Sequence, residues 1–150
     1  MNAPSNRGER LMKPAILDTD ILLDILHGRS ETVRKHAQRY REVYKHYTIS
    51  AVTVAELTRG SLRQGNLPAW LEQVLTQVEV LPLDTASAQL AGRVYGELEH
   101  AGLTIGLADS LIAGIALAHN RVLVTGNVRH FQRVAELGYP LEIVNWREAG

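Results

Sequence analysis

The segment from Met12 to Leu26 constrains the fold of this chain more than any other. It opens with a short apolar run, Ala15–Leu17, that is typical of a buried strand. After Asp18-Thr19-Asp20, apolar residues return at helical spacing. The turn between these two elements therefore places Asp18 and Asp20 at the carboxyl end of a strand, which is where open α/β folds bind their ligands.

These two acids have two interpretations. Burying an uncompensated carboxylate is costly, so a carboxylate at such an edge usually has a partner, often a metal ion. Alternatively, Thr19 or Asp20 simply caps the amino terminus of the following helix. This segment alone does not distinguish a metal site from a helix cap, so the acidic residues elsewhere in the chain are needed to decide.

The composition is that of one ordinary globular domain. The chain has 150 residues, of which 45% are hydrophobic and 21% are charged, and this length suffices to bury a core. It contains no cysteine, which excludes disulfides, thiolate zinc sites and cysteine nucleophiles. Its six histidines show no metal-binding pair spacing, so zinc is not expected. The formal net charge is zero, so a nucleic-acid partner would need a local basic patch.

We expect residues 1–13 to form a disordered tail and residues 14–150 to form the folded domain. The tail lacks the apolar region of a signal peptide. The most apolar stretch, 103–118, is interrupted by Asp109-Ser110 and is too short to span a membrane. Together with the absence of cysteine, this favours a cytoplasmic protein.

Apolar patterns along the chain alternate between strands and helices. After the first strand, strands are expected at 47–50, 78–81, 122–124 and 141–144. Helices are expected between them, and Gly92 and Gly96 in the one that follows Asp84 would permit close helix packing, including across a dimer. Strands separated by helices in this rhythm imply a parallel sheet covered on both faces. The prediction is an α/β fold of three layers with a five-stranded parallel sheet.

Four polar residues each follow a strand or interrupt an apolar helix: Asp18, Glu56, Asp109 and Asn127. Parallel strands end at the same edge of a sheet, so we expect these side chains to point toward one edge. Each acid also has a simpler interpretation, because a first-turn Asp109 would interact favourably with the helix dipole and an exposed Glu56 could pair with nearby arginines. Several acids meeting at one edge, however, would repel one another and require a cation.

Hard oxygen ligands without histidine or cysteine select magnesium or manganese. Such a site suits phosphoryl chemistry, because the metal activates water, orients the phosphate and stabilises the transition state. We therefore expect Mg²⁺, or Mn²⁺ in its place, at this edge.

Four segments of the chain, at residues 17–22, 54–60, 105–113 and 124–131, resemble in order the signature regions of PIN-domain ribonucleases, most closely the VapC-type toxins of toxin–antitoxin pairs. The resemblance spans residues 14–146. It implies a PIN-like fold and a magnesium-dependent endoribonuclease that is the toxin of a type II system. It also implies an RNA substrate and a cognate antitoxin protein as partners, and a homodimer is expected.

The resemblance also implies roles for individual residues. Asp18, Glu56 and Asp109 match the acidic motif positions, and Asn127 stands where the fourth acid is often found. We expect Asp18 and Asp109 to hold one metal ion and Glu56 to orient or deprotonate the water that attacks RNA. Asn127 and Thr125 would hold water or phosphate, and the asparagine argues against a second metal.

Arg59 and Arg63 share a helical face with Glu56 and are expected to contact the substrate or the partner. The basic residues between Arg29 and Lys45 are more simply explained as the solvated face of a helix. Three other functions stay open: a PIN nuclease of RNA maturation, a catalytically weak RNA- or protein-binding PIN module, and a haloacid-dehalogenase-like phosphatase. The last is disfavoured because Leu22 stands where that pattern requires Thr or Val.

Overall fold

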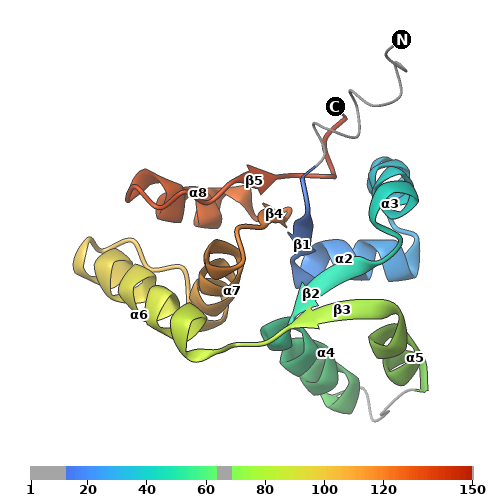
Figure 1. The fold of residues 1–150 in the computed structure, drawn as a ribbon, viewed down its shortest axis with the longest axis horizontal. Coiled ribbons are helices and arrows are strands. Elements are labelled where there is room, and N and C mark those ends of the chain that lie inside the picture. The colour runs from blue at the N-terminus through green and yellow to red at the C-terminus, as the bar shows by residue number, and fades with distance from the viewer. Residues whose placement is uncertain (1–12, 64–68, 150) are drawn as a thin grey trace.

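The structure, a computed structural model, describes residues 13–63 and 69–149. Strands and helices alternate along it as the sequence predicts (Figure 1). The elements are β1 (Ala15–Leu17), α2 (Thr19–His27), α3 (Glu31–Tyr44), β2 (Tyr47–Ser50), α4 (Ala51–Arg63), α5 (Ala69–Gln77), β3 (Val78–Leu81), α6 (Thr85–His100), α7 (Leu107–Ala118), β4 (Val122–Val124), α8 (Val128–Glu136) and β5 (Ile143–Val144). The last strand is shorter than predicted, because it begins at Ile143 rather than Leu141.

The strands pair in parallel, which confirms the α/β class, but they form two sheets. One sheet has three strands in the order β1-β4-β5, and the other joins β2 to β3. The prediction of a single five-stranded sheet was therefore wrong. Although β1 and β2 lie side by side, the Ala15 backbone, which belongs to the β1–β4 pair, bonds to a side chain and not to β2. Its N–H donates to Tyr40 Oη at 2.9 Å, and its carbonyl accepts from the same hydroxyl at 3.3 Å.

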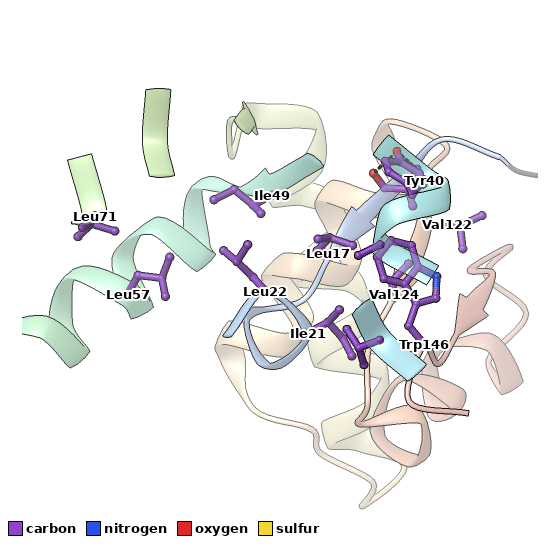
Figure 2. Packing of buried hydrophobic residues seen from close by; sticks show 13 residues of the cluster. Leu17, Ile21, Leu22, Tyr40, Ile49, Leu57, Leu71, Val122, Val124 and Trp146 are labelled. Atoms are coloured by element: carbon purple, nitrogen blue, oxygen red, sulfur yellow. Dashed lines mark hydrogen bonds between the residues drawn. The ribbon is translucent and has the colours of Figure 1, made fainter. Parts of the chain in front are cut away.

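Two hydrophobic clusters cover opposite faces of the three-stranded sheet. Along β1, Ala15 and Leu17 belong to one cluster and Ile16 to the other, as expected when successive side chains point to opposite faces. The first cluster packs against α2 to α5, and the second packs against α6 to α8. Figure 2 shows the first cluster, in which Leu17 and Val124 lie near Tyr40 and Trp146. The result is the three-layer arrangement that the sequence predicts.

The carboxyl ends of the strands lead directly into the segments that carry the predicted site. Asp18 follows β1, and its N–H donates to the Val124 carbonyl of β4 at 2.8 Å. No residue separates β2 from α4, so Glu56 lies in the first half of that helix. Between β4 and α8 lie only residues 125–127. The topology thus places these segments at one edge.

The close helix contact of this fold lies at Gly114 rather than at Gly92 and Gly96. A Cβ atom added at Gly114 would lie 2.5 Å from the Ser87 carbonyl oxygen and 2.7 Å from the Ala91 side chain, so α7 packs directly on the backbone of α6. Atoms added at Gly92 or Gly96 would meet nothing within 4 Å. Within one chain, those two glycines therefore serve no helix packing.

Gly114→Ala is expected to lower the free energy of unfolding by about 1–3 kcal/mol, because the added methyl group has no space and forces the two helices apart. Gly60→Ala on α4 is the matched control, since its side chain would enter open space on a helix. It should raise stability slightly, because alanine favours the helix by up to about 1 kcal/mol. Urea denaturation of both variants measures the difference, and equal stabilities would contradict the packing described.

The predicted tail at residues 1–13 falls almost wholly outside the described residues. Its last residue, Lys13, is described, and Lys13 Nζ pairs with Glu142 Oε2 at 2.9 Å. Within the described ranges, no helix has both the length and the apolar character needed to cross a membrane.

Candidate active site

Asp18 is the buried acid of this edge, with 7% of its surface exposed. It caps α2, because its Oδ1 accepts from the Thr19 N–H at 2.8 Å, so neither Thr19 nor Asp20 is the capping residue. Its Oδ2 accepts from the Thr125 hydroxyl at 2.8 Å. Asp18 can therefore cap α2 and also take part in the site, because Oδ1 accepts from the helix and Oδ2 accepts from Thr125.

Burial raises the pKa of the Asp18 carboxyl from 3.8 to about 7. The neighbouring charges of Asp20 and Asp109 act in the same direction, while the hydrogen bonds from Thr125 and Thr19 oppose them. Asp18 is thus held where its negative charge is unfavourable in the protein alone. A cation at this edge would relieve that cost.

Asp109 lies in the first turn of α7, partly exposed, as predicted. Burial raises the pKa of its carboxyl, the hydrogen bond and charge of His130 lower it, and the charge of Asp20 raises it. His130 Nδ1 lies 3.4 Å from Asp109 Oδ2 and 2.9 Å from the Asn127 amide nitrogen. Depending on its tautomer, this nitrogen donates to Asp109 or accepts from Asn127, so His130 connects the two predicted residues.

Glu56 is held by a short series of hydroxyl groups. The Thr19 hydroxyl donates to Glu56 Oε1 at 2.8 Å and lies 3.0 Å from the Thr53 hydroxyl. Because a hydroxyl has one proton, Thr19 must accept from Thr53 when it donates to Glu56. Thr53 is fully buried, and Ser50 Oγ lies 3.4 Å from its hydroxyl. Thr19 therefore joins the two acids, through its backbone to Asp18 and through its side chain to Glu56.

Of the other predicted residues, Thr125 lies inside the site, whereas Arg59 and Arg63 lie on the surface beside it. Thr125 is fully buried between Asp18 and the backbone N–H of Asn127, which donates to its hydroxyl at 3.0 Å. Arg59 and Arg63 lie exposed on α4, and neither forms an ion pair with another described residue. They lie on the same helix as Glu56, at its solvent side.

This edge offers a metal ion the carboxylates of Asp18 and Asp109 and nearby neutral oxygens. In the described ranges, 13–63 and 69–149, no three Asp, Glu, His or Cys side chains are grouped to hold an ion. Asp18 and Asp109 nevertheless influence each other electrostatically, and Thr125 adds a hydroxyl oxygen. Magnesium is commonly held by one or two carboxylates with several waters, so this set fits Mg²⁺.

Two charged residues beside the site, Asp24 and Arg147, were not recognised from the sequence as parts of it, whereas Asp20 was placed at this edge. Asp20 Oδ2 accepts from the Gly126 N–H at 3.0 Å and lies 3.5 Å from Arg147 Nη1. Asp24 is buried, and its Oδ2 accepts from Arg147 Nε at 2.7 Å. The spacing of Asp20 and Asp24 on one helical face is visible in the sequence. Their partner lies more than 120 residues later, where no local pattern points back to them.

Fold and site together define a class of protein, a three-layer α/β domain with acidic side chains at the carboxyl edge of its parallel strands. The family model described as the PIN domain matches residues 15–137. The tRNA(fMet)-specific endonuclease VapC of Shigella flexneri is 32% identical over 126 residues, which are 81% of this chain and 92% of that protein.

Solved structures agree with this match. The DNA-bound VapBC of Salmonella typhimurium superposes with a TM-score of 0.73 at 30% identity, covering 90% of this chain and 99% of the other. VapBC-1 of nontypeable Haemophilus influenzae gives 0.74 at 28% identity, covering 89% and 98%. The chain belongs to the VapC ribonucleases of the PIN-domain family.

Proposed function

We propose that this VapC-family ribonuclease is the toxin of a toxin–antitoxin pair and cleaves RNA at the edge formed by Asp18 and Asp109, with Mg²⁺ or Mn²⁺ as cofactor. The observation that carries the proposal is the buried Asp18 carboxylate, whose charge is made unfavourable by burial and by Asp20 and Asp109. A buried carboxylate beside other carboxylates is costly, and a bound cation would reduce that cost. We place the reaction in the cytoplasm, where the RNA is.

Each residue of the edge has a defined part in this reaction. Asp18 and Asp109 would hold the ion, which when bound lowers the pKa of water and orients the phosphate. Glu56 Oε1 is fixed by Thr19, so we assign to Oε2 the acceptance of the proton of the attacking water. Thr125 and the Asn127 side chain would position water or a phosphate oxygen. Attack on phosphorus then breaks the phosphodiester bond to the leaving ribose oxygen.

Thr19→Val is expected to lower kcat for RNA cleavage by about tenfold with little change in KM, because it removes the hydroxyl that holds Glu56 but no substrate contact. Thr19→Ser keeps the hydroxyl and should restore most of the activity. Single-turnover cleavage of a defined RNA measures both variants. Equal rates for Thr19→Val and the wild-type protein would show that this hydroxyl does not position Glu56.

We assign contact with RNA phosphates to Arg59 and Arg63, which are exposed beside Glu56 on α4. Replacing both with alanine should weaken RNA binding, and the dependence of log affinity on log salt should become shallower by about 0.7 per lost contact with single-stranded RNA. Arg34, which pairs with Glu31 on the surface of α3, supplies the control. An unchanged salt dependence in the double variant would show that the two arginines do not contact RNA phosphates, and would leave contact with the antitoxin as their role.

The partner that we propose is an antitoxin protein, because the solved relatives are VapBC assemblies. Because the Shigella relative is named as specific for tRNA(fMet), this RNA is the first substrate to test. We also propose a homodimer, for which the open side of α6 at Gly92 and Gly96 allows close approach. Light scattering of the purified chain tests the dimer, and a monomer at micromolar concentration would contradict it.

The cellular experiment is induction of the chain followed by growth measurement and sequencing of RNA ends. We expect growth arrest with new ends at a few positions, absence of both with Asp109→Asn, and restored growth when the antitoxin is co-expressed. New ends at precursor boundaries without arrest would instead indicate RNA maturation. Arrest that Asp109→Asn reproduces, without new ends, would indicate a binding module and contradict the proposal.

A further inference from the structure

The segment after β5 is fixed against α3 by its own contacts. Trp146 is buried, with 6% of its surface exposed, and stacks on His36 of α3. The His36 ring lies 3.1 Å from the Glu148 carbonyl oxygen. The Arg147 N–H donates to Asn145 Oδ1 at 2.9 Å. These contacts direct the Arg147 side chain toward α2.

The Arg147 guanidinium joins three parts of the edge. Nε donates to the buried Asp24 Oδ2 at 2.7 Å, and Nη1 lies 3.5 Å from Asp20 Oδ2. The same Asp20 oxygen accepts from the Gly126 N–H, in the residue before Asn127. A Cβ atom at Gly126 would collide with the guanidinium and with the Asp20 carboxylate, so this packing admits no side chain there.

Arg147 is also the cation that the structure places against an acidic cluster. Among the described residues, Arg147 alone of the arginines and lysines pairs with Asp20 or Asp24. Its charge also interacts with that of Asp18, the proposed metal-holding residue. The arginine therefore offsets part of the negative charge that would attract a divalent ion.

We propose that Arg147 is a positioning residue with two separable effects, an inference that rests on the proposed function. Its charge weakens the binding of a divalent cation at the Asp18–Asp109 edge. Its hydrogen bond to Asp24 and its ion pair with Asp20 fix the Asp20 carboxylate, which accepts from the Gly126 N–H and thereby holds the loop that presents Asn127. The two effects are separable because Arg147→Lys keeps the positive charge but loses most of the hydrogen-bonding geometry of the guanidinium.

The experiment measures Mn²⁺ binding directly, by the electron paramagnetic resonance signal of free Mn²⁺, on the full chain without RNA. Arg147→Met should bind Mn²⁺ about threefold to tenfold more tightly, since a positive charge near the site is lost. Arg147→Lys should bind like the wild-type protein. Arg34→Met, which loses a surface ion pair on α3, is the control and should not change the affinity.

Cleavage kinetics supply the second readout. Both Arg147 variants should lose kcat, by about tenfold, with KM unchanged, because the loop carrying Asn127 is no longer held. Unchanged or weaker Mn²⁺ binding in Arg147→Met would overturn the proposal. If that variant does not fold, wild-type kcat in Arg147→Lys would overturn it instead. Mn²⁺ binding without RNA cleavage by the wild-type chain would contradict only the proposed function, whereas no Mn²⁺ binding would contradict both.

Discussion

Asp109→Asn is expected to reduce RNA cleavage by a factor on the order of 10²–10³ while the protein stays folded. The substitution keeps the size of the side chain but removes the charge of one of the two carboxylates that we assign to the metal, which removes several kcal/mol of transition-state stabilisation. Because Asp109 is partly exposed in the first turn of α7, the helix does not depend on it. Cleavage at saturating Mg²⁺, with circular dichroism as the test of folding, measures the effect.

Glu99→Gln is a matched control for Asp109→Asn, because it removes one exposed carboxylate from α6, a helix that carries no residue of the proposed site. It should cleave RNA at the wild-type rate. Undiminished cleavage by folded Asp109→Asn at saturating Mg²⁺ would count against Asp109 as a metal-holding residue and would leave the buried Asp18 without its proposed partner.

Asp18→Asn is expected to stabilise the metal-free protein at pH 8 while abolishing cleavage. The folded pKa of Asp18 is raised from 3.8 to about 7, so the folded state binds the proton more tightly than the unfolded state does. Its carboxylate therefore costs stability progressively as the pH rises from about 4 to about 7, by up to roughly 4 kcal/mol. Asparagine removes this cost but has one acceptor oxygen in place of two, so it cannot accept from both the Thr19 N–H and the Thr125 hydroxyl, which offsets part of the gain.

Thermal unfolding in EDTA at pH 5 and pH 8 measures this effect. The stabilisation by Asp18→Asn should be large at pH 8 and small at pH 5, and added Mg²⁺ should stabilise the wild-type protein but not the variant. Asp24→Asn is the control that should lower stability, because it replaces the charge-assisted hydrogen bond between Asp24 and Arg147 by a weaker neutral one. A wild-type protein that is more stable than Asp18→Asn at pH 8 without metal would contradict the raised pKa.

The sequence predicts those features of this protein that depend on neighbouring residues. An apolar run that stops at an acid locates β1 and Asp18, and the alternation of strands and helices predicts parallel strands whose carboxyl ends share an edge. The same reasoning places Asp109 at the start of α7 and Asn127 after β4. Such features are local, so they can be recognised without knowing what packs against them.

The features that the sequence does not predict arise from contacts between distant segments. Tyr40 bonds to the backbone of Ala15, which belongs to a different element, and the five strands pair as two sheets instead of one. Helix packing occurs at Gly114, where Ser87 and Ala91 approach, although Gly92 and Gly96 have the more obvious spacing. Arg147 reaches Asp20 and Asp24 from the last residues of the chain. No periodicity or motif encodes these partners.

Incubation of the purified, partner-free chain with RNA tests whether a cation-dependent site for RNA cleavage lies at the Asp18–Asp109 edge. We expect no cleavage in EDTA, cleavage at discrete positions after Mn²⁺ or Mg²⁺ is added, and none with Asp18→Asn under the same conditions. Equal cleavage in EDTA, or cleavage by Asp18→Asn at the wild-type rate, would contradict a cation-dependent site at this edge.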